Sequence, residues 1–238
     1  MTKEEFIHIG EKLSMMPLPH KNRAARKSDG FKYVIYRLMR PLLKMKYQAF
    51  QKKNPDAPWI SPGSIFVLKQ ILNKNMVGFE FGSGRSTVFY AELLNHITAI
   101  EHFKPWYSKV KALLESKTIQ NTSLKLIEAN GDVPPQHLSS EMQLYISAEE
   151  YPVKDDAFTN YINVLDEYSN SHFDFIAVDG RARLSCVLKS IPKLKKGGFL
   201  LLDNSERKRY YPAIEALNDW PKIFTTTGLT DTTIWMKP

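Results

Sequence analysis

Short apolar runs alternate with helical patterns over the chain from residue 57 onward. Five of these runs are uninterrupted: Met76–Phe81, Ile97–Ile100, Leu124–Ile127, Phe173–Val178 and Phe199–Leu202. Such runs are typical of strands that are buried on both faces of a parallel sheet. The pattern therefore predicts an α/β fold, in which helices cover the sheet.

Helical patterns fill most of the intervals between these runs. Ser61-Pro62 has the chemistry of a helix N-cap and first turn, and it opens a helix that continues to Ile71. Lys195–Gly198 is expected to end a later helix, because it combines a cationic last turn with a glycine stop. The other expected helices are Ser86–Leu94, Pro105–Lys117, Ala182–Leu194 and Pro212–Asn218.

Two stretches depart from this alternation. At the end of the chain, Phe224–Thr227 and Thr232–Met236 flank Gly228, which predicts two strands joined by a turn. Residues 131–172 contain a single helical pattern, near Phe158–Tyr168. An excursion of that length is either functional, as a lid or substrate loop, or ordinary surface structure, and both interpretations stay open.

The net charge of +8 is concentrated at the N-terminus. Up to Asp56 there are 13 Lys and Arg against 5 Asp and Glu, whereas the rest of the chain has 20 of each. Asn54–Pro58 has the composition of a linker. We therefore expect residues 1–56 to form a basic helical appendage with an anionic partner, and residues 57–238 to form the main domain.

A basic amphipathic pattern lies between Phe31 and Phe50. Aromatic and aliphatic residues alternate there with Arg37, Arg40 and Lys44 at helical spacing, and Pro41 interrupts or kinks the expected helix. One interpretation is a peripheral contact with an anionic membrane. The other is a helix that packs on the main domain with its charges in water. The second is preferred because basic helices are common and this one is broken.

Composition narrows the class of protein. No apolar stretch reaches the roughly eighteen residues of a spanning helix. Met1–Glu5 is charged and lacks the apolar core of a secretory signal. Cys186 is the only cysteine, which excludes an internal disulfide and a thiolate metal site. These features predict a cytoplasmic protein, with peripheral attachment to the membrane as the alternative.

The clearest chemical signal is the glycine-containing loop after the first run. Gly82-Ser83-Gly84 allows a tight turn and the close approach of a ligand to the backbone. The second expected strand ends in Glu101, 21 residues after Glu80. A carboxylate there can accept hydrogen bonds from both hydroxyls of a ribose. Thr87 replaces the third glycine of the dinucleotide fingerprint, which counts against a dehydrogenase that binds pyrophosphate.

Several motifs in order resemble those of class I S-adenosylmethionine-dependent methyltransferases. Glu80–Gly84 followed by Ala99–Glu101 resembles the first two motifs of that family, and Asn130-Gly131-Asp132 is similar to its adenine-side loop. Asp179-Gly180 and the strand after Lys196–Gly198 also fit. The resemblance covers residues 61–238. It implies a Rossmann-like, doubly wound, seven-stranded sheet that is mostly parallel and has an antiparallel C-terminal hairpin.

The resemblance also implies roles for individual residues. Glu80 would face the amino group of S-adenosylmethionine and Glu101 its ribose, and Asp132 would face the adenine amine. The loop Gly82-Ser83-Gly84 would pass close to the methionine portion, with His102 as a neighbour of the cofactor. The alternatives are structural: Glu80 bonded to neighbouring amides, Asp132 in an Asx turn, and His102 in a packing role.

Two strand ends carry candidate catalytic groups. Asp179 follows the fourth run, and Asp203-Asn204 follows the fifth. Together they suit Mg²⁺ or another divalent cation, an arrangement similar to that of the catechol and caffeoyl-coenzyme A O-methyltransferases. The alternative is that Asp179 acts as a base or binds substrate, while Asp203 and Asn204 cap the following turn.

Arginines follow the same strand ends. Arg181, Arg183 and Arg207 are candidates to bind a carboxylate or phosphate on the methyl acceptor. Alternatively, they balance the neighbouring acidic groups.

These patterns predict a methyltransferase that acts on an oxygen of a small molecule or saccharide. One alternative is a nucleic-acid methyltransferase that uses the basic N-terminus as a clamp. The balanced charge of the main domain, and the lack of an Asn-Pro-Pro-aromatic motif, count against it. Another is a non-catalytic protein of this fold that docks on membranes or a partner through residues 1–56.

Overall fold

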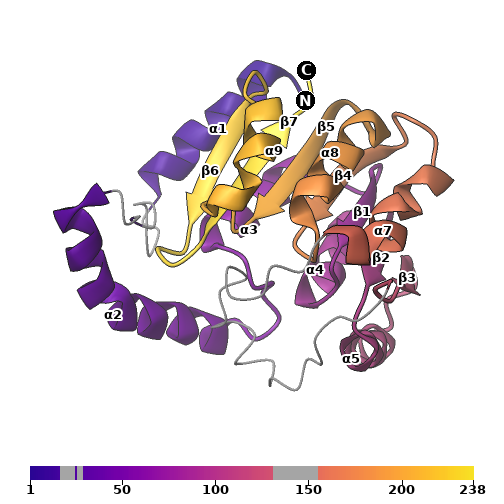
Figure 1. Ribbon diagram of the computed structural model, residues 1–238, viewed down its shortest axis with the longest axis horizontal. Helices are drawn as coiled ribbons and strands as arrows, with labels where there is room; N and C mark the ends of the chain where they lie inside the picture. The colour runs from indigo at the N-terminus through magenta and orange to yellow at the C-terminus, as the bar shows by residue number, and fades with distance from the viewer. Residues whose placement is uncertain (17–24, 26–28, 131–154) are drawn as a thin grey trace.

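Seven strands form one sheet with helices on both faces (Figure 1). The computed structural model describes residues 1–16, 25, 29–130 and 155–238. The strand order is β3-β2-β1-β4-β5-β7-β6. The strands are β1 (Val77–Phe81), β2 (His96–Glu101), β3 (Thr122–Leu126), β4 (Phe173–Val178), β5 (Leu194–Asp203), β6 (Lys222–Thr226) and β7 (Asp231–Met236). This confirms the predicted Rossmann-like sheet.

The helices occupy the expected intervals between strands. The longer ones are α1 (Lys3–Met15), α2 (Phe31–Lys53), α3 (Pro62–Ile71), α4 (Arg85–Leu93), α5 (Lys104–Ser116) and α8 (Arg183–Lys193). The shorter ones are η2 (Asp155–Phe158), α7 (Thr159–Asn163), η3 (Val164–Glu167), η4 (Lys208–Tyr210) and α9 (Tyr211–Ala216). The helical pattern near Phe158–Tyr168 therefore forms several short turns rather than one helix. The rest of the predicted excursion, 131–154, lies outside the described residues.

One expectation about a helix end is wrong. Lys195–Gly198 does not end a helix, because β5 already begins at Leu194. Leu194 pairs with Phe173 of β4, and Gly197 donates its backbone N–H to the Lys237 carbonyl at 2.9 Å. Gly197 has a φ of +76°, a conformation that glycine adopts easily, and it lies where the register between β4 and β5 shifts.

The parallel strands bring their carboxyl ends to one edge of the sheet. Phe81 of β1 pairs with Ile100 of β2 and with Val178 of β4, and Val178 pairs in turn with Leu202 of β5. β7 runs antiparallel to both β5 and β6, which confirms the predicted C-terminal hairpin. The loops after β1, β2, β4 and β5 therefore meet at the same edge, as the cofactor hypothesis requires.

Alternating side chains of the central strands fill two cores. Ala177 and Leu201 belong to the core that contains Leu68 of α3. Their neighbours Ile176 and Leu200 belong to the opposite core, beneath α7, α8 and α9. Burial of each large aliphatic side chain stabilises the fold by about 1.5–3 kcal/mol. The two-sided burial explains why the strands are continuous apolar runs.

The N-terminal segment contributes two different helices. Thr2 and Glu5 form a capping box at the start of α1, and Phe6 of this helix is fully buried against Phe199 of β5, with ring centroids 5.5 Å apart. In contrast, α2 buries only Leu43, and although the helix continues through Pro41, Figure 1 shows it bent rather than straight, which agrees with the predicted kink. Figure 1 shows α2 beside the layered domain rather than within it. No helix in the described ranges is long and apolar enough to cross a bilayer.

Candidate active site

The loop after β1 packs directly against the loop after β4. Gly82 has a φ of +91°, and a Cβ atom there would lie 2.7 Å from the backbone of Gly180. A Cβ at Gly180 would lie 2.1 Å from the Tyr161 hydroxyl oxygen. That hydroxyl is buried and has no hydrogen-bond partner in the part of the chain that the structure describes. Both glycines are thus needed for the contact between the two loops, in addition to any contact with a ligand.

Glu101 joins the end of β2 to the glycine loop. One carboxylate oxygen accepts hydrogen bonds from the backbone N–H and the hydroxyl of Ser83, both at 3.2 Å. The other accepts from the backbone N–H groups of His102 and Phe103, at 2.9 and 3.0 Å. Burial acts to raise the pKa of Glu101, but these hydrogen bonds and the imidazole of His102 outweigh it, so that the pKa is lowered. The carboxylate therefore remains charged at the mouth of the sheet.

Two aromatic side chains frame this carboxylate. The Nδ1 atom of His102 lies 2.9 Å from Glu101, and its Nε2 atom lies 3.5 Å from the Nε atom of Arg181. Trp106 of α5 donates its indole N–H to the Ser83 carbonyl at 2.7 Å. Trp106 is not among the residues predicted for the site, although an aromatic residue five positions after Glu101 is a signal that the sequence contains. These contacts tie the glycine loop to the end of β2 and to α5.

Glu80 lies beneath the loop and is fully buried. Its two carboxylate oxygens accept hydrogen bonds from the hydroxyls of Ser86 and Thr87, at 2.5 and 2.6 Å. Burial raises the pKa of Glu80 to about 8, although these two hydrogen bonds oppose the shift. Glu80 thus anchors the first turn of α4, and this geometry does not favour the direct contact with the cofactor that the sequence suggested. Asp132, the expected partner of adenine, lies outside the described residues.

Arg183 occupies the space between the two candidate metal ligands. Its guanidinium lies 2.7 Å from the carboxylate of Asp179 and 3.6 Å from that of Asp203. It also donates to the carbonyls of Asp179, Gly180 and Asp203. The side chain is only 10% exposed. Arg183 therefore ties the ends of β4 and β5 together, and its donors are not available for the substrate role that the sequence suggested.

The same geometry argues against a divalent cation. The Oδ1 atom of Asp203 accepts the Thr232 hydroxyl at 2.7 Å, and its other oxygen faces Arg183. Asn204 adopts a left-handed conformation, with φ of +56°, in the turn that leads to Arg207. Within the described ranges, no group of three or more His, Cys, Asp or Glu is placed to hold a metal ion. The residues do not fit Mg²⁺ as they stand, since the guanidinium of Arg183 already lies between the two carboxylates, where the cation would have to bind.

Three carboxylates, those of Glu101, Asp179 and Asp203, lie at the carboxyl ends of the strands, and Asp179 is the most exposed of them. Its side chain is 30% exposed, whereas those of Glu101 and Asp203 are 5% and 8% exposed. Partial burial of the carboxylate raises the pKa of Asp179, and the negative charge of Asp203 raises it further, while the positive charge of Arg183 lowers it. A carboxylate with a raised pKa is suited to accept a proton near neutral pH. The catalytic role of Asp179 stays a prediction.

The two remaining candidate arginines lie in different surroundings. Arg181 is beside His102, and burial together with Arg183 lowers the pKa of its guanidinium. The Nε atom of Arg207 lies 3.8 Å from the Glu206 carboxylate. The positive charge of Arg207 also acts to lower the pKa of Asp179. A role of Arg181 and Arg207 in binding the acceptor stays a prediction.

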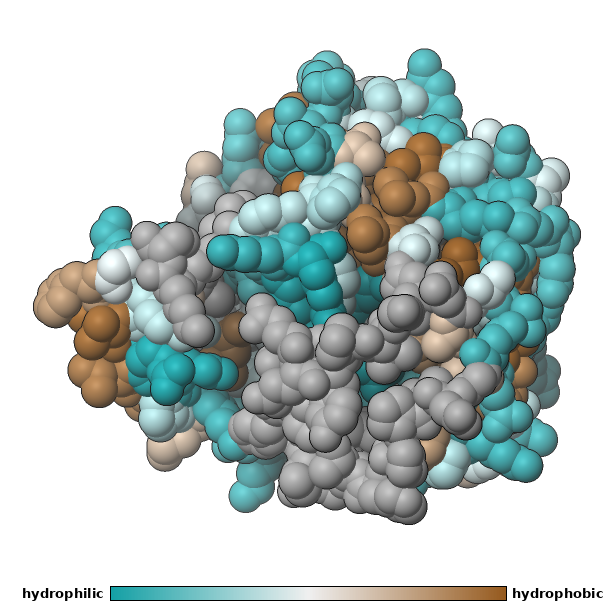
Figure 2. All heavy atoms as spheres, in the orientation of Figure 1, coloured by the Kyte–Doolittle hydropathy of each residue, from teal (hydrophilic) through white to brown (hydrophobic). Residues whose placement is uncertain are grey.

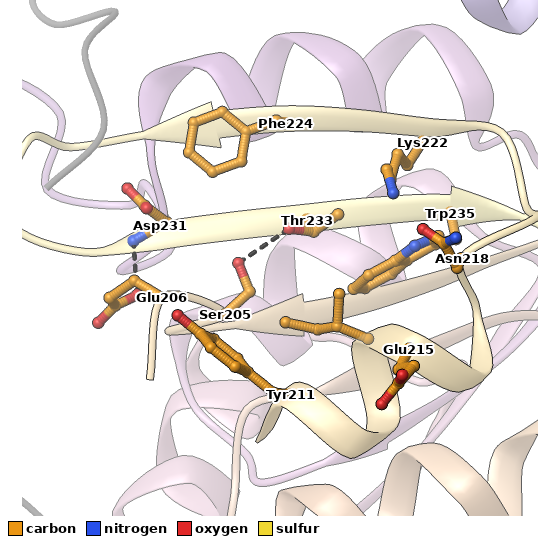
Figure 3. Close-up of a pocket in the computed structure, with 11 residues that line it drawn as sticks. Ser205, Glu206, Tyr211, Glu215, Asn218, Lys222, Phe224, Asp231, Thr233 and Trp235 are labelled. Atoms are coloured by element: carbon orange, nitrogen blue, oxygen red, sulfur yellow. Dashed lines mark hydrogen bonds between the residues drawn. The ribbon is translucent and has the colours of Figure 1, made fainter. Parts of the chain in front are cut away.

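A separate cavity of about 580 Å³ lies between α9 and the β6–β7 hairpin (Figure 3). It contains none of the predicted site residues. Its lining combines acidic, amide, hydroxyl and aromatic side chains: Ser205, Glu206, Tyr211, Ile214, Glu215, Asn218, Lys222, Phe224, Asp231, Thr233 and Trp235. Two of its lining residues, Ser205 and Glu206, directly follow Asp203 and Asn204 in the chain. The sequence does not predict this cavity, since its walls come from α9, from both strands of the hairpin and from the turn after β5.

The polar groups of the cavity include one without a partner. The indole nitrogen of Trp235 is buried and has no hydrogen-bond partner among the described residues. At the other end, the Asp231 backbone N–H donates to Glu206 at 2.9 Å (Figure 3). Burial raises the pKa of Glu206 to about 7.

Comparison with solved structures identifies the architecture. A protein from Streptococcus mutans that is assigned as a methyltransferase, in complex with SAH, matches with a TM-score of 0.51 and 15% identity, over 74% of this chain and 96% of its own. This is the class I methyltransferase fold. The same methyltransferase fold appears in a methyltransferase-like protein from Silicibacter pomeroyi, with a TM-score of 0.53 and 22% identity, over 76% of this chain and 89% of its own.

An rRNA methylase from Streptococcus thermophilus also has the methyltransferase fold, with a TM-score of 0.52 and 15% identity, over 76% of this chain and 99% of its own. No family model matches the sequence, and no curated protein does. At these sequence identities the similarity establishes the methyltransferase fold alone. The reaction has to be inferred from the residues of the candidate site.

Proposed function

We propose that this protein is an S-adenosylmethionine-dependent methyltransferase. The single observation that carries the proposal is the contact of the charged Glu101 carboxylate with Ser83 of the glycine loop, at the carboxyl edge of the sheet. The Streptococcus mutans protein of the same fold was solved with SAH, the product form of this cofactor. The fold, the loop and the carboxylate all support the same ligand.

The residues present fit that cofactor. Glu101 would exchange its hydrogen bonds from Ser83 for the hydroxyls of the ribose. An added Cβ at Gly84 would meet only the Ser86 hydroxyl, at 3.7 Å, so the backbone there leaves room for the methionine portion. The unpartnered Tyr161 hydroxyl beside Gly180 is a further polar group at this loop. His102 and Trp106 would support the pocket from the side. When bound, the sulfonium supplies an electrophilic methyl group.

Asp179 supplies the chemistry on the acceptor side. Methyl transfer is an in-line displacement, so the protein must align the acceptor oxygen and remove its proton. Asp179 would accept that proton, because it is exposed at the mouth and has a raised pKa. Arg183 holds the Asp179 carboxylate in place, and Arg181 and Arg207 provide positive charge nearby. No step requires a metal ion.

The cavity beside α9 supports a hydroxylated small molecule or a saccharide as the acceptor. Glu206, Asn218 and Thr233 offer hydrogen-bonding groups, and Tyr211 and Trp235 offer aromatic surfaces. Its three acidic residues outnumber its one lysine, so the cavity would repel the phosphates of a nucleic acid. The lining therefore favours the oxygen of a neutral acceptor over a nucleic acid.

Calorimetric titration with S-adenosylmethionine tests the proposal. The purified protein should bind the cofactor, and Glu101→Ala should lower the affinity at least about tenfold. Glu115→Ala, which changes an exposed carboxylate at the far end of α5, is the matched control and should bind normally. Circular dichroism should show that both variants are folded. If the unaltered protein released no heat and gained no thermal stability with the cofactor, the proposal would be wrong.

A further inference from the structure

α2 carries an apolar stripe that faces water. Phe31 and Leu38 are each 77% exposed, and Met45 is 65% exposed. Four more apolar residues of the same helix have exposed fractions of 43–52%: Val34, Ile35, Met39 and Leu42. Figure 2 shows apolar side chains gathered on this projecting part of the molecule, beside hydrophilic ones. A stripe of this length is unusual on a free surface and indicates a site of interaction.

The stripe lies on a single face of the helix. Each member lies three or four positions from at least one other, and Phe31, Leu38 and Met45 follow one another at intervals of seven, so the members line up along one side. The side toward the domain is different: Leu43 is buried there, and the Tyr47 hydroxyl donates to the Ile60 carbonyl at 3.4 Å. Leu43 and Tyr47 are offset around the helix from the stripe. The exposed face therefore points away from the domain.

The charge of α2 indicates which kind of partner binds to the exposed apolar face. The helix has seven Lys and Arg residues and no Asp or Glu. Six of the seven are exposed: Lys32, Arg37, Arg40, Lys46, Lys52 and Lys53. A second copy of the chain would bring two such sets of positive charge together, which disfavours a self-association through α2. A nucleic acid would pair with the cations but leave the apolar stripe in water.

We propose that α2 is an amphipathic helix that docks the protein on the surface of an anionic lipid bilayer. The apolar stripe would enter the boundary between headgroups and acyl chains, while the basic residues would contact anionic headgroups. With 23 residues the helix is about 34 Å long, and it lies in the interface rather than crossing it, as its hydropathy requires.

Docking through α2 would hold the candidate active site close to the membrane. Near the end of α2, Gln51 accepts a hydrogen bond from Arg85 at 3.3 Å, and Arg85 is the first residue of α4 after the glycine loop. The guanidinium of Arg85 also lies over the ring of Trp59, 5.2 Å from its centroid. These two contacts connect the end of α2 and the nearby Trp59 to the first residue of the helix that follows the glycine loop.

Flotation of the full chain with vesicles tests this proposal. The protein should float with phosphatidylcholine vesicles that contain phosphatidylglycerol, and less with phosphatidylcholine alone or at high salt. The double variant Leu38→Glu/Met45→Glu should bind the anionic vesicles at least about tenfold more weakly, since it places two charges in the apolar stripe. Leu188→Glu, at a 43% exposed leucine of α8, is the control and should float normally.

Other results would overturn the assignment. If the double variant floated as well as the unaltered protein, or if neither floated, α2 would not be a membrane-docking helix. Salt-sensitive RNA binding without flotation would reassign the cations to nucleic acid, and a dimer that the double variant dissociates would reassign the stripe to self-association. Affinity for S-adenosylmethionine should be the same in all variants, so failure of the docking proposal is distinguishable from failure of the proposed function.

Discussion

Glu101 accepts two hydrogen bonds from Ser83, one from the backbone N–H and one from the hydroxyl, each 3.2 Å long. The pair joins β2 to the loop after β1, across the mouth of the sheet. Because the carboxylate has a lowered pKa, it is an anionic acceptor already in position for the hydroxyls of a ligand. The glycine loop and the Glu101 carboxylate are thus held in position by hydrogen bonds within the protein.

The first prediction concerns the charge of Glu101. Glu101→Gln keeps the size of the side chain but removes the anion, so it should weaken binding of S-adenosylmethionine by about 1.5–3 kcal/mol, or roughly tenfold to hundredfold. Titration calorimetry measures the change. Equal affinity in the variant would show that the ribose is held by other groups.

The second prediction concerns the packing of the two glycine loops. Gly82→Ala should lower the free energy of unfolding by about 2–5 kcal/mol, because it combines a left-handed backbone with a clash against Gly180. Gly30→Ala is a matched control: Gly30 has a φ of +57°, but no atom lies within 4 Å of the added Cβ. It should cost about 1 kcal/mol. Urea unfolding compares them, and equal losses would contradict the proposed clash.

The third prediction concerns the pH dependence that Glu80 confers. Its pKa is about 8 in the folded protein and 4.5 in the reference state, so between these values the folded state binds more protons than the unfolded state. The contribution of Glu80 to stability should therefore decrease as the pH rises through this window, by at most about 1.4 kcal/mol per pH unit. Glu80→Gln, which does not titrate, should gain stability relative to the unaltered protein as the pH rises. A difference independent of pH would show that Glu80 has an ordinary pKa.

The fourth prediction concerns Asp179 as the base. With an acceptor found by screening hydroxylated compounds for release of S-adenosylhomocysteine, Asp179→Asn should lower kcat by about 10²–10⁴ and leave cofactor affinity unchanged. In the unaltered enzyme, kcat should rise with pH through the raised pKa of Asp179, because only the deprotonated carboxylate accepts a proton. The variant should lose this rise. An unchanged pH profile in the variant would assign the base elsewhere.

The fifth prediction concerns metal ions. Since the Arg183 guanidinium lies between the carboxylates of Asp179 and Asp203, EDTA should not lower the rate of methyl transfer. Addition of Mg²⁺ to the treated enzyme should have no effect either. Loss of activity with EDTA, and its return with Mg²⁺, would restore the metal site at Asp179, Asp203 and Asn204.

Several features of the site could be predicted from the sequence because they depend on strand ends. Gly82, Glu101 and Asp179 each follow an apolar run, and the carboxyl ends of parallel strands meet at one edge. Other features could not be predicted. From the sequence, Arg183 was a candidate to bind the substrate, whereas in the structure its guanidinium contacts the ends of two strands. Glu80 was a candidate to contact the cofactor, whereas in the structure its carboxylate accepts hydrogen bonds from the first turn of α4.

The sequence by itself determined the class of fold, since uninterrupted apolar runs and helical periods are local properties of the chain. It also located the glycine loop and Glu101. Only the tertiary structure decided which partner each polar group has, that α1 belongs to the core, and that the apolar face of α2 points into water. The physical reason is that burial and hydrogen bonding depend on residues far apart in the sequence, whereas a periodic pattern records only that a helix has an apolar face.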